Sequence, residues 1–315
     1  MGDLQSATNK MTSHLEASTL FNVDGMVAVV TGGGSGIGLV MAQSLATNGA
    51  KKVYILGRRL DMLTAAAQSH PSILTPIQCD VTSKASLQSA VDQITADAGY
   101  VNLLIANSGI LGNTNRWDWT FTKPIAEVRA ELFTNNSMEA FTDVFNVNVT
   151  GAFFTLTAFL ELLDAGNKHA VAKGGFGAPL TPGGKFPIVQ SQVIVTSSIS
   201  AFSRSGISAP QYTASKAAVL QLVKQASTNL AAYGIRVNAL APGLFPSEMA
   251  QVIMATRKPE EEGPANALFI PAKRFGTEEE MAGTLLFLAS RAGAYCNGSH
   301  IVNDGGRLAV MPSGY

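Results

Sequence analysis

The chain has 315 residues, of which 46% are hydrophobic, and its 22 basic residues balance its 22 acidic ones. This hydrophobic content is sufficient for a large core and argues against a chain that is disordered throughout. A net charge of zero without a basic cluster argues against nucleic acid as the main partner. The two cysteines, Cys79 and Cys296, lie far apart and form no CxxC pair, which indicates free thiols in a reducing, cytoplasmic setting. The four histidines are scattered, so no metal site is predicted.

The first 20 residues are polar and contain no apolar stretch for a secretion signal, so we expect a disordered tail there. The start "MGDLQS" matches the permissive pattern for N-myristoylation at Gly2, but an unmodified tail is the favoured interpretation. The longest strongly apolar run, residues 149–163, is shorter than the roughly 20 residues that span a bilayer. It is interpreted as a buried helix, and no membrane partner is predicted.

Short apolar runs alternate with helical patterns from about residue 26 to the C-terminus. The runs predicted to be strands are residues 26–31, 52–56, 73–78, 101–107, 192–198, 235–241 and 299–303. The predicted helices are "GLVMAQSLATNG", which ends at Gly49, and the segments near 59–69, 84–98, 138–165, 211–233 and 277–290. This alternation predicts an α/β fold in which residues 21–315 form a single domain. Its core is a doubly wound, seven-stranded parallel sheet with helices on both faces.

Ligands of such sheets bind beyond the carboxyl ends of the strands, which sorts the loops by function. Residues 166–190 precede the fifth strand and hold six glycines and three prolines, so we expect a mobile surface insertion without a catalytic role. Residues 244–276 follow the sixth strand and are expected to form a mobile lid over the substrate. The segments predicted to lie on the active edge are 32–36, 108–136, 199–210 and 242–276.

A glycine-rich segment, "VVTGGGSGIGLV", connects the first predicted strand to the first helix, with the spacing Gly32-x3-Gly36-x-Gly38. Glycines let the backbone approach a pyrophosphate, and the helix N-terminus offers N–H groups and the positive end of its dipole. A glycine turn between a strand and a helix therefore predicts a dinucleotide site of the Rossmann type.

In "APQYTASKAAV", Tyr212 and Lys216 lie four residues apart and therefore on one face of a helix. A free phenol has a pKa of about 10, too high for easy proton exchange near neutrality. A nearby ammonium group lowers that pKa, so the pair is interpreted as an acid and the group that tunes it. The less favoured alternative is a solvated Tyr and Lys on a surface helix.

Together, in this order, these motifs resemble the short-chain dehydrogenase/reductase superfamily, in its single-domain type. Its patterns are T-G-x3-G-x-G, N-x-G and Y-x3-K preceded by a serine, here residues 31–38, 107–109, 212–216 and "TSS" at 196–198. The resemblance implies an oxidoreductase that transfers hydride between a nicotinamide and a ketone or secondary alcohol, favouring a reductase of metabolite carbonyls. Recruitment to a non-redox cyclisation or isomerisation, or a role as a cofactor-binding scaffold, stays open.

The resemblance also implies a set of catalytic residues. Ser198 would hold the substrate oxygen against the phenol of Tyr212. It lies one residue farther from the tyrosine than is usual in the family, which leaves Ser197 as a rival. Asn148, in "NVTG", corresponds to the asparagine that holds a water linked to Lys216.

The end of the second strand bears on the choice of cofactor. The sequence "LGRRLD" has no acidic residue there to bind the ribose 2′-hydroxyl of NAD. Gly57 leaves room, and Arg58 is the best candidate for binding a 2′-phosphate, so NADP(H) is favoured over NAD(H). Arg59 is either a second contact or a solvated start to the next helix.

Asp80 resembles the family's adenine-contacting aspartate, with a helix N-cap as its alternative role. By resemblance, Tyr212 and Lys216 also contact the cofactor. The other residues that the resemblance places there are Thr31, Gly32, Ser35, Gly36, Ile37, Gly38, Val81, Asn107, Gly109, Pro242, Gly243, Leu244 and Ser247.

The helices predicted at 138–165 and after Tyr212 are apolar over more of their circumference than one sheet face requires. Relatives pair these two helices, so we expect a homo-oligomer, with a tetramer favoured over a dimer. Trp117 and Trp119 follow the fourth strand on the active edge, where they either line a substrate pocket or cover the core.

Overall fold

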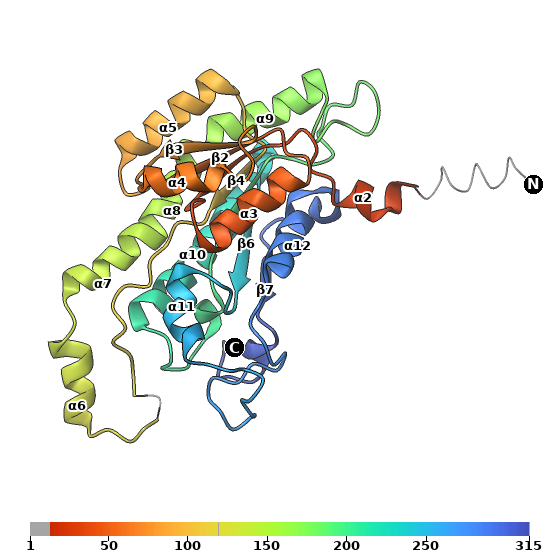
Figure 1. Cartoon of the computed structure of the whole chain (residues 1–315). Helices are drawn as coiled ribbons and strands as arrows, with labels where there is room; N and C mark the ends of the chain where they lie inside the picture. Colours follow the sequence, from red (N-terminus) through yellow and green to blue (C-terminus); the bar gives the residue numbers. More distant parts are fainter. Residues whose placement is uncertain (1–12, 119, 315) are drawn as a thin grey trace, which may run out of the picture.

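The seven predicted strands form one parallel sheet in the order β3-β2-β1-β4-β5-β6-β7 (Figure 1). The structure is a computed structural model that describes residues 13–118 and 120–314. The strand order reverses between β1 and β4, which is where a ligand crevice opens in folds of this kind. The strands are β1 (Val27–Thr31), β2 (Lys52–Gly57), β3 (Leu74–Gln78), β4 (Leu103–Ala106), β5 (Gln192–Thr196), β6 (Arg236–Pro242) and β7 (His300–Asn303).

Helices cover both faces of the sheet, as predicted for a doubly wound fold. On one face α3, α4 and α12 pack over β1 and its neighbours through side chains such as Met41, Leu63 and Leu285. On the other face α5 and α8–α10 bury side chains such as Ile94, Phe159 and Val223. The helices are α2 (Ala17–Leu20), α3 (Gly36–Thr47), α4 (Leu60–Ala67), α5 (Lys84–Asp97), α6 (Ile125–Arg129), α7 (Met138–Phe145), α8 (Ala152–Ala158), α9 (Leu160–Lys173), α10 (Pro210–Asn229), α11 (Glu248–Ala255) and α12 (Glu278–Ala289).

The continuous helix predicted over residues 138–165 is wrong in detail. A π-helical segment, Asn146–Gly151, separates α7 from α8, and a break at Phe159 separates α8 from α9. Helix α9 then runs on to Lys173, so the first eight residues of the expected insertion are helical, because Gly166 and Ala170 continue its buried face. The loop that remains is closed at its base, where the backbone N–H of Ile188 donates to the Gly177 carbonyl at 2.9 Å.

The N-terminal segment also differs from expectation. Residues Ser13–Leu15 form a 3₁₀ turn, and α2 follows it, so residues 13–20 are not the disordered tail that was predicted. Gly2 and the rest of residues 1–12 lie outside the described residues.

Among residues 13–118 and 120–314 no single helix is both long and apolar enough to cross a bilayer. The bent pair Met138–Ala158 and Leu160–Lys173 passes the criteria by length and composition only.

Candidate active site

The glycine loop between β1 and α3 has the geometry of a phosphate cradle. Gly32 and Gly36 have φ values of +67° and +53°, a region that favours glycine. A Cβ on Gly38 would lie 2.2 Å from the Gly32 carbonyl oxygen, so no side chain fits there. Ser35 is the N-cap of α3, but its side chain makes no capping hydrogen bond. The loop thus leaves the N-terminus of α3 open for an anion, and the residues fit the pyrophosphate of a dinucleotide.

Thr31 and Asn107 join β1 to β4 at the point where the strand order reverses. The buried Thr31 hydroxyl accepts hydrogen bonds from the backbone N–H groups of Asn107 and Ser108, at 3.0 and 3.1 Å. The Asn107 side chain donates from Nδ2 to the Thr31 carbonyl at 3.1 Å. These contacts hold the floor of the crevice, which is the location predicted for both residues.

Two exposed arginines stand at the end of β2. Arg58 has no carboxylate within 4.0 Å among residues 13–118 and 120–314. Arg59 pairs through Nη2 with Oε2 of Glu248, the first residue of α11, at 2.9 Å. Arg59 is the N-cap of α4 and its side chain is 58% exposed, as the alternative of a solvated helix start predicted, and its charge is also paired with a residue 189 positions away.

Asp80 lies close enough to Arg58 for the two charges to interact. Its carboxylate accepts hydrogen bonds from the backbone N–H and the hydroxyl of Thr82, at 2.9 and 2.7 Å. These bonds lower the pKa of Asp80, and the charge of Arg58 lowers it further. The alternative role as a helix N-cap is wrong, because α5 is capped by Ser83, whose hydroxyl accepts from the Ser86 N–H.

Helix α10 begins with Pro210 in its first turn and brings Tyr212 and Lys216 to the same site. The buried Lys216 ammonium lies 5.8 Å from the Tyr212 ring centroid and donates to the Thr196 carbonyl at 2.8 Å. Burial lowers the pKa of Lys216 to about 8.

The pKa of Tyr212 differs from the sequence-based prediction. Burial raises the pKa of the phenol, while a hydrogen bond with Ser198 acts in the opposite direction. In the protein alone, Lys216 therefore does not give the phenol a lowered pKa. The physical reason is that the ammonium is directed at the Thr196 carbonyl, and that desolvation of both groups disfavours their charged forms.

The two rival serines have different partners. Ser197 is buried, and its hydroxyl donates to the backbone carbonyl of Lys216 at 2.8 Å. This hydrogen bond joins the end of β5 to α10. The Ser198 hydroxyl accepts from the Ser200 N–H at 3.1 Å and also hydrogen-bonds with Tyr212. The geometry favours Ser198 as the serine that faces the phenol.

Asn148 is buried inside the π-helical segment. Its amide exchanges hydrogen bonds with the backbone of Ile110, at 2.8 and 3.0 Å, and donates to the Ser215 hydroxyl at 3.0 Å. A Cβ on Gly109 would lie 3.1 Å from Asn148 Oδ1 and 3.3 Å from Lys216 Nζ. Gly109 thus allows the amide and the ammonium to approach the same spot. The π-turn is the local feature that aims Asn148 inward, and such turns are common at functional sites.

The segment after β6 closes the crevice from the other side. Pro242 ends β6, Gly243 donates its N–H to the Asn303 carbonyl at 2.8 Å, and the Leu244 carbonyl accepts from Gly276 at 3.0 Å. Ser247 caps α11 by accepting from the Ala250 N–H at 3.1 Å. A Cβ on Gly36 would lie 2.9 Å from Ser247 Cβ, so α11 begins directly against the glycine loop.

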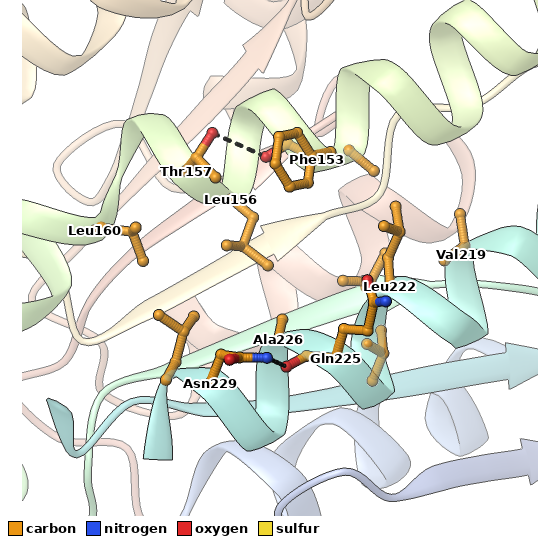
Figure 2. Close-up of a pocket in the computed structure, with 13 residues that line it drawn as sticks. Phe153, Leu156, Thr157, Leu160, Val219, Leu222, Gln225, Ala226 and Asn229 are labelled. Atoms are coloured by element: carbon orange, nitrogen blue, oxygen red, sulfur yellow. Dashed lines mark hydrogen bonds between the residues drawn. The ribbon is translucent and has the colours of Figure 1, made fainter. Parts of the chain in front are cut away.

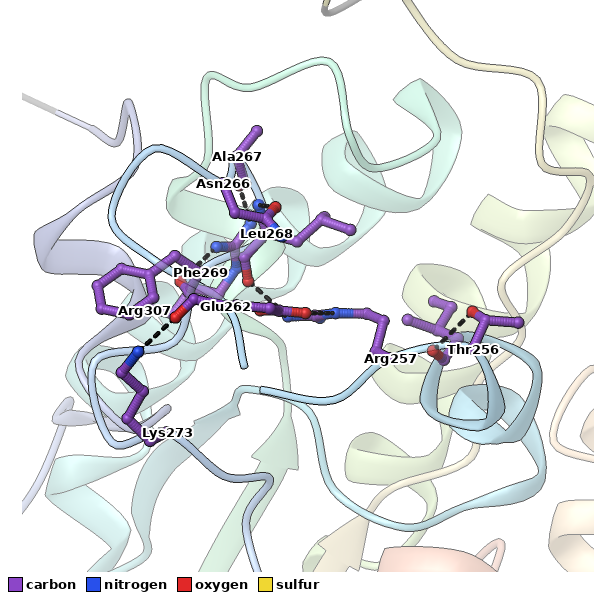
Figure 3. A network of polar contacts seen from close by, with 10 residues as sticks. Thr256, Arg257, Glu262, Asn266, Ala267, Leu268, Phe269, Lys273 and Arg307 are labelled. Atoms are coloured by element: carbon purple, nitrogen blue, oxygen red, sulfur yellow. Dashed lines mark hydrogen bonds and ion pairs between the residues drawn. The ribbon is translucent and has the colours of Figure 1, made fainter. Parts of the chain in front are cut away.

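A buried ion pair in the middle of the predicted lid was not predicted from the sequence (Figure 3). Arg257 and Glu262, with side chains only 6% and 9% exposed, form a bidentate pair at 2.8 and 2.6 Å. Arg307 donates to the carbonyls of Phe269 and Ala267, at 2.7 and 2.8 Å. These contacts tether the lid to the C-terminal segment. The charged stretch "RKPEEE" suggested only a solvated loop, and no periodicity signalled the pairing.

Three other predicted residues lie to the side of this centre. Val81 belongs to the core and packs against Gly151, and Ile37 packs against the opposite core cluster. Trp117 is 56% exposed, so it does not cover the core, and Trp119 lies outside the described residues. Across residues 13–118 and 120–314 no cluster of His, Cys, Asp or Glu has the arrangement of a metal site.

The geometry defines a nucleotide-binding oxidoreductase fold, and comparison with known proteins places it more closely. Residues 26–172 match the family model described as short chain dehydrogenase, and residues 186–307 match one described as enoyl-(acyl carrier protein) reductase. The short-chain dehydrogenase/reductase SAT3 of Stachybotrys chartarum is 62% identical over 87% of this chain and 100% of its own length. The chain therefore belongs to the short-chain dehydrogenase/reductase family and is an oxidoreductase of that family.

Other relatives are more distant. The short-chain dehydrogenase/reductase PhomF of Diaporthe leptostromiformis is 43% identical over 98% of this chain and 100% of its own length. Among solved structures, the Pseudomonas aeruginosa RhlG/NADP active-site complex is similar with a TM-score of 0.71 at 29% identity. The similarity covers 91% of this chain and 98% of that one.

Proposed function

We propose that this protein is an NADP(H)-dependent ketoreductase that reduces the carbonyl group of a small metabolite. The observation that carries the proposal is the convergence of Ser198, Tyr212, Lys216 and Asn148 beside the glycine loop. They come from three local structures: Ser198 follows the end of β5, Tyr212 and Lys216 lie on α10, and Asn148 lies in the π-turn. When bound, the nicotinamide supplies the hydride.

The chain's own residues supply the proton and its path. Because burial raises the pKa of Tyr212, the phenol is protonated at neutral pH and can donate to a carbonyl oxygen. Ser198, hydrogen-bonded to that phenol, holds the substrate oxygen in place. Lys216 is mostly protonated at pH 7 with a pKa of about 8, and its Nζ lies within reach of Asn148 across Gly109. This arrangement favours replenishment of the phenolic proton from the lysine side.

The preference for NADP(H) is supported by charge at the end of β2. Glycine at position 57 replaces the acidic residue that would bind a free ribose 2′-hydroxyl and repel a phosphate. Arg58 is exposed, and the described residues leave its charge without a carboxylate, which makes it the first candidate for a 2′-phosphate. The RhlG structure, which was solved with NADP, is a relative with the same fold.

We also infer that the chain assembles with copies of itself through α8 and α10. An apolar groove lies between these helices (Figure 2), and its volume is about 240 Å³. It is lined by side chains such as Leu156, Val219 and Leu222, and Phe153 at its edge is 44% exposed. Apolar surface of this kind is typical of an interface. The free thiols of Cys79 and Cys296 support a reducing compartment such as the cytosol.

The proposal is tested by following NADPH absorbance at 340 nm with a panel of ketones that includes cyclic, aromatic and acyl-thioester substrates. We expect consumption of NADPH with at least one class, and slower consumption of NADH. If the protein binds NADPH but oxidises it with none of the ketones, the non-redox alternative is favoured instead.

A further inference from the structure

The first turn of α11 bridges the two halves of the predicted cofactor site. Glu248, its first residue, pairs with Arg59 at the end of β2 at 2.9 Å. The preceding residue, Ser247, lies against Gly36 of the glycine loop. A single turn of the lid thus contacts both the phosphate cradle and the region where the 2′-phosphate of NADP(H) is predicted to bind.

The geometry of the ion pair allows another anion to replace Glu248 on Arg59. The Arg59 and Glu248 side chains are 58% and 54% exposed, and exposed ion pairs contribute little to stability. The pair uses one nitrogen of the guanidinium, Nη2, and the other N–H groups of Arg59 make no hydrogen bond within residues 13–118 and 120–314. A phosphate monoester carries about −1.5 to −2 charges near neutral pH and accepts bidentate hydrogen bonds from arginine. It is therefore a stronger partner for Arg59 than a single carboxylate.

From this geometry we propose that Glu248 is a specificity-determining residue that competes with the 2′-phosphate of NADP(H) for Arg59. The 2′-phosphate of NADP(H) displaces the Glu248 carboxylate from Arg59, which removes this contact between the end of β2 and α11. NAD(H), which has no 2′-phosphate, leaves the pair intact. Glu248 therefore reduces the affinity for NADP(H) and has no effect on the affinity for NAD(H). This inference rests on the proposed preference for NADP(H) and adds the lid residue that limits it.

The test titrates NADPH and NADH into the protein in the absence of substrate. The affinities are measured by isothermal titration calorimetry. The proteins are the wild type, Glu248→Gln, Arg59→Ala and the double variant. Loss of an exposed competing charge corresponds to a roughly two- to fivefold change in affinity. We expect Glu248→Gln to bind NADPH two- to fivefold more tightly and NADH unchanged. The gain should shrink between 50 and 500 mM salt, because surface charges are screened.

The controls distinguish an effect of the Arg59–Glu248 pair from a general effect of net charge. Glu260, an exposed lid carboxylate without an ion pair among the described residues, gives the matched variant Glu260→Gln, which should bind both cofactors as the wild type does. In the Arg59→Ala background the gain from Glu248→Gln should disappear. Weaker or unchanged NADPH binding by Glu248→Gln, an equal gain for NADH, or a gain that survives Arg59→Ala would each overturn the inference. A wild type that binds NADH as tightly as NADPH would instead refute the proposed cofactor preference.

Discussion

Replacement of Tyr212 by phenylalanine removes a single oxygen atom from the centre of the proposed mechanism. The phenol has a hydrogen bond with Ser198, and its ring packs at the start of α10, so the fold keeps all its apolar contacts in Tyr212→Phe. The lost hydrogen bond costs about 1 kcal/mol of stability at most. General acid catalysis contributes roughly 10²–10⁴-fold to a rate, so we expect kcat to fall by at least about 100-fold. NADPH affinity should change little.

The assay is steady-state reduction of the best ketone, with NADPH affinity measured separately by titration. Tyr233→Phe is the matched control, because Tyr233 is exposed and lies on a 3₁₀ turn remote from α10's first turn. This control should retain wild-type kcat. If Tyr212→Phe turns over its substrate at the wild-type rate, the phenol is not the acid, and the proposed reduction chemistry is wrong.

Five further variants probe other parts of the molecule. Ser198→Ala should lower kcat without weakening NADPH binding, whereas Ser197→Ala should lower the melting temperature and spare kcat, since its hydroxyl serves the α10 backbone; the reverse pattern would reassign the serine. Arg58→Ala should weaken NADPH but not NADH in titrations, and an unchanged ratio would exclude the 2′-phosphate role. Glu262→Gln should cost about 3 kcal/mol of unfolding free energy, measured in urea, because it breaks a buried pair. The pKa of Glu262 is depressed, so this difference is present above the unfolded value of about 4.3 and is lost as pH falls through the lower folded value. Phe153→Glu places a charge in the α8–α10 groove and should give a 33 kDa species in light scattering where the wild type is larger.

The fold was predictable because its signals are local and redundant. Each strand is a short apolar run with β-branched residues, and β1 and β5 are buried along their whole length. A glycine turn between β1 and α3 then fixes where the crevice lies. The order of the strands follows from the short, right-handed connections that parallel sheets use.

The parts that sequence reasoning missed depend on tertiary contacts. Helix α9 continues beyond residue 165 because Gly166 lies against the Val101 carbonyl, where a Cβ would come within 2.3 Å. The glycines and prolines farther along this segment had instead indicated a loop. The π-turn at Asn148 is held by hydrogen bonds to Ile110 and Ser215, and neither partner is visible in the local sequence. The Arg257–Glu262 pair likewise depends on its surroundings, since Arg257 also donates to the Leu268 carbonyl and the charge of Arg307 acts on Glu262.

The direction of the Tyr212 pKa shift shows why a motif does not fix electrostatics. A spacing of four residues places Lys216 on the correct face of α10, but it does not state what the ammonium is bonded to or how dry its surroundings are. Here the Lys216 ammonium donates to the Thr196 carbonyl. Burial raises the pKa of Tyr212 and lowers that of Lys216. The motif therefore points to Tyr212 as the proposed acid, while the pKa of its phenol depends on burial and on the groups around it.

Helix α10 would link the proposed catalysis to the proposed assembly along one stripe of its surface. Val219 and Val223 continue the stripe of Tyr212 and Lys216, one and two turns farther along, and they line the groove shared with α8. A helix moves as a rigid unit over such a short distance, because its backbone hydrogen bonds couple successive turns. A second copy packed in the groove would therefore restrain the helix that positions the phenol. The apolar side chains that α10 presents to the groove would then serve the position of the proposed acid as well as the association of subunits.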